Sequence, residues 1–148
     1  MYDIFSELKK SANKHLKKLA VCDINYELTY EGLLTEVDAV SKVLNLYSIK
    51  KGDRVVHCIS NKIEFVIVHY AILSIKAISV PVEYKTTQKN LSEIIEIIKP
   101  NFIFTQDLYY FKDYSNIDAQ ISSNRINRLS NIYLIRPQQN VEKILLSD

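Results

Sequence analysis

The side chains best suited to chemistry in this chain are three histidines and two cysteines. A zinc site would need Cys, His or carboxylate ligands at short spacings, but His15, His57 and His69 fall on three different predicted elements without such partners. A catalytic thiol–imidazole pair would need both side chains on the same face of the strand. His57 and Cys58 are consecutive in a predicted strand, so they point to opposite faces. We therefore expect core or surface histidines, and we interpret Cys22 and Cys58 as buried thiols of a cytosolic protein.

Paired carboxylates can support general acid–base catalysis when their surroundings shift the pKa of one partner. Glu93 and Glu96 lie one turn apart on a predicted helix, and Glu27 and Glu31 are similarly spaced near a predicted hairpin. Nothing in the pattern buries either pair, so we interpret both as solvent-facing. Asp53 precedes a predicted strand but lacks the neighbouring acidic residues of a phosphoacceptor site. The sequence thus predicts no catalytic residue, no cofactor-binding residue and no metal ligand in this chain.

Glycines that could cradle a phosphate are scarce. Phosphate loops need residues without a Cβ, so that backbone N–H groups can close on the anion. The chain has two glycines, Gly32 and Gly52, twenty positions apart. No Walker loop, dinucleotide fingerprint or nucleophile elbow can be written with them. Nucleotide capture by a glycine loop is therefore not encoded in these residues.

The charge balance argues against a polyanionic partner. The 148 residues carry 19 Lys and Arg against 17 Asp and Glu, a net charge of +2. The densest basic stretch lies in the predicted N-terminal helix and comprises Lys9, Lys10, Lys14, Lys17 and Lys18. We interpret it as the solvated face of an amphipathic helix. A nucleic-acid or membrane patch is the alternative, but no aromatic residue is interleaved to stack on bases. The expected partners exclude nucleic acid and membrane.

No targeting or membrane segment is visible in the sequence. The chain begins Met1-Tyr2-Asp3, without the basic start and apolar stretch of a signal peptide. The most apolar segment, residues 65–82, is interrupted by His69 and Lys76 and nearly ended by Pro81. It is too short and too broken to cross a bilayer. We therefore predict a cytoplasmic location.

Apolar periodicity predicts helices alternating with strands along most of the chain. In chain order these are a helix over 3–19, a hairpin over 20–30 turning at 23–25, a helix after the N-cap Thr29 up to 47, a strand over 54–59, a helix capped by Ser60 or Asn61 up to 75, a core strand over 78–82, a helix over 91–98, and strands over 101–105 and 132–135. Residues 107–130 are predicted as a loop with a short helix, and 144–146 could begin another strand.

This order predicts one α/β domain over residues 1–148. Strands joined by helices imply right-handed crossovers and a doubly wound, mainly parallel sheet with helices on both faces. An N-terminal helix and a β-hairpin precede the sheet. The sequence contains no internal repeat, linker or low-complexity segment that would mark a domain boundary.

Between residues 28 and 105 the segments resemble a known family, the adenylate-forming superfamily. Leu28-Thr29-Tyr30-Glu31-Gly32-Leu33 resembles the L-T-Y-x-E-L element of its N-terminal subdomain, and residues 49–55 resemble its G-V-x-x-G-D-x-V turn. Residues 60–65 resemble N-S-x-E-F, and residues 73–82 resemble L-K-A-G-A-V-Y-V-P-L. Each motif is weak alone, but four in order are fairly specific. The superfamily comprises acyl-CoA synthetases, luciferases and peptide-synthetase adenylation domains.

Two departures from the family pattern stand out. Lys76 occupies the position of the glycine in L-K-A-G-A, and Glu83-Tyr84-Lys85 replaces the P-x-x-P that commonly follows. Some CoA ligases carry a basic residue near the CoA phosphates at the place of Lys85, although a solvent-exposed loop lysine is the favoured interpretation. Residues 1–20 and 106–148 match no family motif.

The resemblance implies a reaction whose working parts lie beyond these residues. In the family a carboxylate attacks the α-phosphate of Mg-ATP to form an acyl-adenylate, and CoA or a carrier protein then takes the acyl group. The phosphate loop, ribose-binding acid and catalytic lysine come later in family members. The resemblance therefore implies ATP and Mg²⁺ for the complete enzyme and no bound cofactor for this segment. It does not indicate the acyl or amino-acid substrate.

Two hypotheses from different classes follow. The leading one is the N-terminal scaffold of an acyl- or aminoacyl-adenylating ligase, inactive alone and partnered by the remainder of the enzyme or a complementary subunit. The alternative is a stand-alone, non-catalytic interaction module, or a split-ligase subunit, derived from that scaffold. A scaffold cut from a larger fold should expose an apolar edge or face. A module that evolved to stand alone should have covered it.

Overall fold

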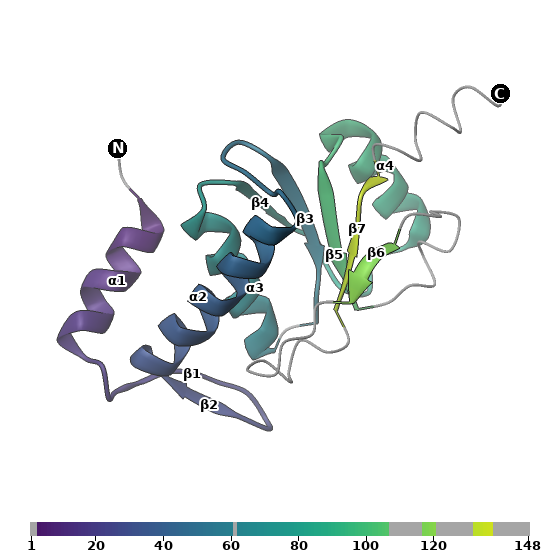
Figure 1. Cartoon of the computed structure of the whole chain (residues 1–148). Helices are drawn as coiled ribbons and strands as arrows, with labels where there is room; N and C mark the ends of the chain where they lie inside the picture. Colours follow the sequence, from purple (N-terminus) through teal and green to yellow (C-terminus); the bar gives the residue numbers. More distant parts are fainter. Residues whose placement is uncertain (1–2, 61, 107–116, 121–131, 138–148) are drawn as a thin grey trace, which may run out of the picture.

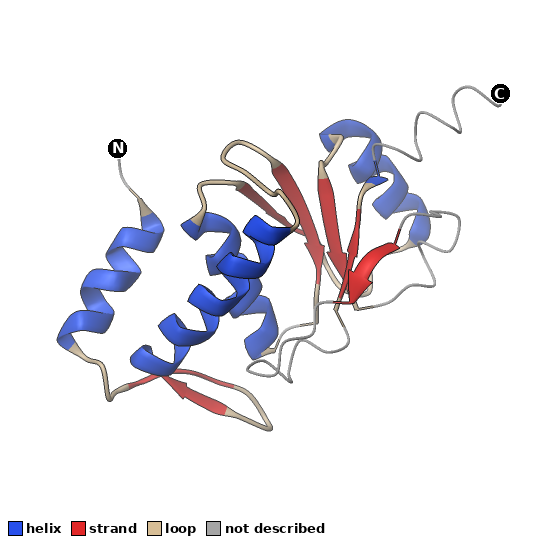
Figure 2. Ribbon diagram, in the orientation of Figure 1, coloured by secondary structure: helices blue, strands red, loops and turns tan. Residues whose placement is uncertain are grey.

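A five-stranded sheet with helices on both faces forms the centre of the computed structural model (Figures 1 and 2). The structure describes residues 3–60, 62–106, 117–120 and 132–137. The strand order is β4-β3-β5-β7-β6. The strands are β3 (Arg54–Cys58), β4 (Ile78–Pro81), β5 (Phe102–Thr105), β6 (Ile117–Gln120) and β7 (Tyr133–Ile135). The predicted α/β class, with helices on both faces of a sheet, is confirmed.

The sheet is mixed, with a parallel part and an antiparallel part. β3 pairs in parallel with both β4 and β5. β7 pairs antiparallel with β5 and with β6. Parallel neighbours need long crossovers, which α3 and α4 provide. The parallel arrangement expected from the sequence therefore holds over β4, β3 and β5.

Two helices, α2 (Tyr30–Leu46) and α3 (Ile63–Ser74), cover one face of the sheet. α3 is buried on several sides, because it lies between α2, α1 and the sheet. Fully buried side chains in this layer include Leu44, Ile63, Ile67, Ile72 and Phe104. Burying large apolar side chains of this kind stabilises a fold by about 1.5–3 kcal/mol each. This layer holds the larger of the two apolar cores.

The opposite face of the sheet is covered by α4 (Gln88–Ile98). Leu91 and Ile95 of this helix pack in a second core with residues of β3, β5 and β7. Cys58 lies in this second core, whereas the neighbouring His57 is in ring contact with Phe65 of α3 on the other face. The predicted alternation of His57 and Cys58 is confirmed.

The N-terminal region consists of α1 (Ile4–Lys14) and a hairpin of β1 (Leu19–Cys22) and β2 (Glu27–Thr29). The predicted hairpin is confirmed, and so is the Thr29 cap, because its hydroxyl accepts a hydrogen bond from the Gly32 N–H at 3.1 Å. α1 ends at Lys14, five residues before the predicted end of the helical stretch. Asp3 caps its first turn.

Several sequence-based predictions need correction. α3 begins after Lys62, whose side chain makes no capping hydrogen bond, so neither Ser60 nor Asn61 is its N-cap. Cys22 is exposed rather than buried. The strand predicted over 78–82 is the outer strand β4 and is only partly buried, since it has β3 as its single strand neighbour in the described sheet.

The C-terminal predictions meet the structure in part. A strand, β6, forms within residues 107–130, where a loop and a short helix were expected; residues 107–116 and 121–131 lie outside the described residues. The fourth predicted strand is confirmed as β7. The strand proposed at 144–146 also falls outside the described residues. Within the described part of the chain, every helix is too short or too polar to span a bilayer.

Candidate functional site

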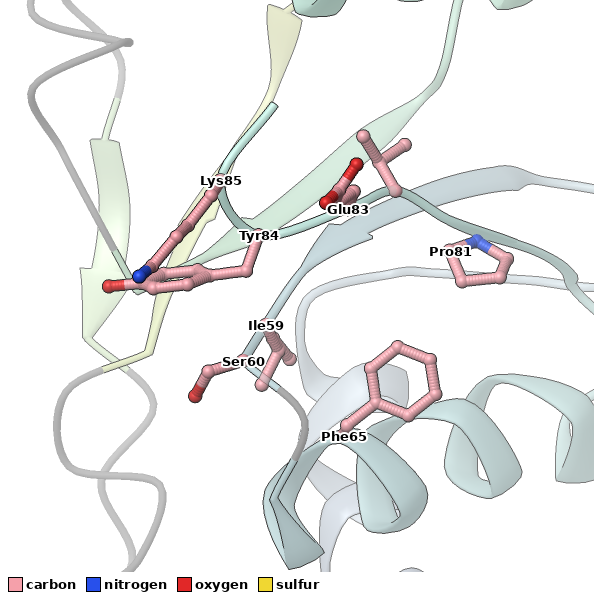
Figure 3. A pocket seen from close by; sticks show the side chains of 8 residues that line it. Ile59, Ser60, Phe65, Pro81, Glu83, Tyr84 and Lys85 are labelled. Atoms are coloured by element: carbon pink, nitrogen blue, oxygen red, sulfur yellow. The ribbon is translucent and has the colours of Figure 1, made fainter. Parts of the chain in front are cut away.

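An open hollow of about 550 Å³ lies where the parallel strands β3 and β4 end (Figure 3). In open α/β sheets this carboxyl edge is the usual place for ligands. We call it the β3–β4 hollow. Its lining includes Ile59, Ser60, Phe65, Pro81, Tyr84 and Lys85. Phe65 enters from the first turns of α3, whereas the last three residues belong to the end of β4 and the turn after it.

Two hydrogen bonds to Gln106 fix Ser60, which lines the hollow. Both the backbone N–H and the hydroxyl of Ser60 donate to Oε1 of Gln106, at 2.9 and 3.0 Å. Ser60 follows β3 and Gln106 follows β5, so these hydrogen bonds join the ends of two adjacent strands. The Ser60 hydroxyl therefore has a structural partner already.

The polar side chains at the rim are suited to binding rather than to bond-making. Tyr84 and Lys85 extend to the same side in Figure 3, away from Phe65. Lys85 and Glu83 are exposed, and Tyr84 is half-buried. An amine, a phenol and a carboxylate at an open rim can orient a ligand through hydrogen bonds and charge.

A partly buried polar cluster lies next to the hollow. The hydroxyl of Ser79 on β4 is 2.9 Å from Nε2 of His57 on β3 and 2.8 Å from Nδ1 of His69 on α3. Burial, together with the nearby His69, lowers the pKa of His57 to about 3. Burial also lowers the pKa of His69. Both imidazoles are therefore neutral at pH 7.

No sequence pattern predicted this cluster. His57 and His69 were correctly placed on different elements and away from Cys58, but the crossover brings their rings to 5.7 Å. The available signal was weak: Ser79, His57 and His69 are each a polar residue within an apolar run. That pattern shows that each needs a partner, and only the three-dimensional pairing shows which partner.

The other candidate residues lie where little chemistry is possible. His15 is exposed just after α1, and the Glu27, Glu31, Glu93 and Glu96 side chains are exposed as predicted. Asp53 is buried but closes a turn by accepting the Lys50 N–H at 2.9 Å. Burial raises the pKa of the Cys58 thiol to about 12, so it is not a nucleophile at neutral pH.

One buried carboxylate escaped the sequence analysis. Glu64, in the first turn of α3, is 7% exposed, and its Oε2 has no hydrogen-bond partner among the described residues. Its neighbours Ile63 and Phe65 do not indicate that the carboxylate is buried, and the only sequence signal at Glu64 is its place in the motif at residues 60–65. Across the described residues no group of three or more His, Cys, Asp or Glu side chains gathers to hold a metal ion.

The two glycines, both among the described residues, do not form a phosphate-binding loop. Gly52 has a φ of +85° and belongs to the turn before β3, at the opposite end of the strand from the β3–β4 hollow. Gly32 lies in the first turn of α2, where an added Cβ would sit 3.4 Å from Leu28 and Thr29. Both glycines therefore serve the scaffold, and the described residues provide no backbone cradle for phosphates.

Comparison with known proteins assigns the family. A model of the AMP-binding enzyme family matches residues 8–144, which is nearly the whole chain. The chain belongs to the AMP-binding enzymes. The match confirms the resemblance seen in the four ordered motifs between residues 28 and 105, and it extends to both flanks of that segment.

Solved structures place the chain within the N-terminal subdomain of these AMP-binding enzymes. The N-terminal subdomain of NpsA from Klebsiella oxytoca matches with a TM-score of 0.70 and 20% identity, over 73% of this chain and 28% of that subdomain. NpsA has also been solved in an artificially fused adenylation–PCP di-domain. Coronafacic acid ligase from Pectobacterium brasiliense matches with a TM-score of 0.65 and 30% identity, over 69% of this chain and 20% of that protein.

A sequence relative is similar over a shorter stretch. Protein Y of Streptomyces griseus is 28% identical over 82 residues, which is 55% of this chain and 27% of that protein. This AMP-binding chain thus spans between a fifth and three tenths of the length of the relatives it matches. Its fold matches part of the N-terminal subdomain of NpsA.

Proposed function

We propose that this chain is the N-terminal scaffold of an ATP-dependent ligase that adenylates an acyl or amino acid and then forms a thioester. The observation that carries the proposal is the family match over residues 8–144 in a chain that spans only 20–28% of the relatives' length. The scaffold supplies a sheet edge and the β3–β4 hollow. It does not supply the charged groups and metal on which phosphoryl transfer depends.

The exposed apolar surface supports a scaffold that meets further protein. Ile97, on α4, is 79% exposed and lines a second groove of about 570 Å³ between α4 and β4. Ile78, on the outer strand β4, is 50% exposed. A module that evolved to stand alone would be expected to cover such residues. The partners proposed for this chain are therefore the remainder of the adenylating enzyme or a complementary subunit, with CoA or a carrier protein as acyl acceptor in the complete enzyme.

The first prediction concerns activity. The 148-residue chain alone should give ATP–pyrophosphate exchange at background with any of a panel of aliphatic, aromatic and amino carboxylates, because the residues for ATP and Mg²⁺ are supplied elsewhere. An intact adenylating enzyme assayed in parallel shows that the conditions support exchange. Exchange that rises with one carboxylate and disappears without it would contradict the proposed division of labour.

A second observation separates the scaffold from a stand-alone module. The coding sequence beyond Asp148, or a second chain that co-purifies with this one, should contain a Ser/Thr/Gly-rich loop followed by lysine. Mixing the two chains should then restore exchange. A stop codon with no complementary chain, and a protein that stays monomeric and inactive, would favour the non-catalytic module.

A further inference from the structure

Three polar side chains from three elements meet at one hydroxyl beside the β3–β4 hollow. His57 is fully buried on β3, Ser79 is half-buried on β4, and His69 is half-buried on α3. Both imidazoles are within 3 Å of the Ser79 oxygen. The ring of Phe65, which lines the hollow, lies 4.8 Å from His57 and stacks 6.1 Å from His69.

Counting hydrogens fixes the direction of these two hydrogen bonds. Nδ1 of His57 is buried with no partner, so a proton placed there would be a buried donor without an acceptor. The His57 proton therefore belongs on Nε2, which donates to the Ser79 oxygen. The Ser79 hydroxyl then donates its one hydrogen to Nδ1 of His69, which leaves the His69 proton on Nε2. Both imidazoles are neutral in this arrangement.

A further proton on either imidazole breaks this arrangement. On His57 it would occupy the buried, unpartnered Nδ1. On His69 it would occupy Nδ1, where the Ser79 hydrogen already lies. The titratable neighbours of the pair are each other and Tyr70 of α3, whose ring is 5.7 Å from that of His69. Among the described residues no carboxylate contributes to the pKa of either histidine, so a positive charge there has no compensating partner.

We propose that His57, Ser79 and His69 form an acid-sensitive clamp that holds the outer strand β4, and with it one wall of the β3–β4 hollow, onto the sheet. β4 has β3 as its single strand neighbour in the described sheet, so a side-chain tie to α3 adds restraint where backbone pairing is one-sided. Ser79 is two residues before Pro81, which lines the hollow. Opening the clamp would therefore move that wall.

The sign of the pH dependence follows from burial. His57 has a pKa of about 3 in the closed form and returns to about 6.5 when β4 detaches and water reaches it. The open form therefore binds more protons between these values, and the stability of the clamp is complete above about pH 6.5 and falls as the pH drops toward 3. For His57 alone, going from pH 7 to pH 5 should raise the opening equilibrium roughly 25-fold.

Hydrogen exchange at β4 in the 148-residue chain tests this. The Val82 N–H donates to the His57 carbonyl at 3.0 Å, so its protection reports on detachment of the strand. Between pH 7 and pH 5, after correction for intrinsic exchange, protection should fall roughly 25-fold or more. His57→Phe, which cannot titrate and keeps an aromatic ring against Phe65, should flatten this dependence. His15→Gln, which alters the exposed histidine, should leave it unchanged.

Nitrogen-15 NMR of the wild-type imidazoles supplies a readout that needs no variant. At pH 7 both His57 and His69 should show a protonated Nε2 and a bare Nδ1, and His57 should remain neutral at pH 6. Ser79→Ala should lower the protection of the Val82 N–H at pH 7 by roughly tenfold, because the buried Nε2–H of His57 loses its acceptor, the Ser79 oxygen. The proposal would be overturned by protection that does not change with pH in the wild type, by a His57 proton on Nδ1, or by a cationic His57 at pH 6.

Discussion

Asp23 joins two parts of the chain that are forty residues apart. Its Oδ1 accepts hydrogen bonds from the backbone N–H groups of Asn25 and Tyr26, which form the hairpin turn. Its Oδ2 accepts the Ile63 N–H at the start of α3. Free N–H groups at a helix start need acceptors. One carboxylate therefore shapes the hairpin and caps a helix that has no cap of its own.

Replacing Asp23 with Ala should destabilise the fold, because the turn and the helix start lose their acceptor together. We expect Tm to fall by roughly 2–4 °C, in the range of a lost helix cap. The Ile63 N–H bond lowers the pKa of Asp23, so its stabilisation is present above about pH 3.8 and is lost as the pH falls further. Thermal unfolding at pH 7 and pH 3 measures both effects.

Asp38→Asn is the matched control for Asp23. Asp38 forms an exposed ion pair with Lys42 on α2, at 3.0 Å, and exposed pairs contribute little. Its Tm should change much less than that of the Asp23 variant. If the two variants had equal effects at pH 7, the cap across the hairpin would not be stabilising.

Three helices in the described part of the chain end without glycine. Ser48, Lys76 and Lys99, which follow α2, α3 and α4, have φ values of 64°, 62° and 49°. This left-handed region is crowded for residues with a Cβ, and glycine usually occupies it at helix ends. The backbone thus explains why glycine suits the position that Lys76 occupies in the motif. After α4, the Arg54 guanidinium donates to the carbonyls of Ile98 and Lys99 and supports the turn.

Lys76→Gly should therefore stabilise the protein by about 1 kcal/mol, because it relieves the crowded φ at an exposed site while the backbone bonds of the turn remain. Lys42→Gly is the opposite case, since Lys42 lies exposed in the middle of α2 and glycine there should cost about 1 kcal/mol. Chemical denaturation of the two variants measures both. Destabilisation by Lys76→Gly would mean that the lysine side chain contributes contacts of its own.

The elements themselves were largely predictable from the sequence. Apolar spacing located α2, α3 and α4, and β-branched runs located β3, β5 and β7. The cap at Thr29 followed from local chemistry. Local chemistry could not predict which distant segments come together. It left open the outer position of β4, the direction of β7, the cap from Asp23 to Ile63 and the contact of His57 with His69. Each depends on residues far apart in the chain.

The whole molecule carries apolar side chains that its own fold does not cover. Ile24, Leu46 and Ile97 are 93%, 82% and 79% exposed. Ile97 and Ile95 lie on the same helix, α4, yet Ile95 is 6% exposed and packs in the second core. This contrast separates side chains that stabilise the isolated chain from those available to another protein surface.

Substituting Lys at these two positions tests the contrast. Ile97→Lys should change the free energy of unfolding by less than about 0.5 kcal/mol and reduce binding of an apolar dye. Ile95→Lys should destabilise by more than about 3 kcal/mol, since it buries an unpaired charge. Denaturation and dye fluorescence of both variants provide the measurement. Equal destabilisation would show that Ile97 already contributes to the core of the isolated chain.

The link between Arg136 and Tyr47 has a consequence for the order in which the protein matures during synthesis. The Arg136 guanidinium donates to the Tyr47 carbonyl at the end of α2, 89 residues earlier, at 3.0 Å. The parallel strands β4, β3 and β5 need only the first 105 residues. This hydrogen bond cannot form until residue 136 has left the ribosome, so the end of α2 acquires this restraint late in translation.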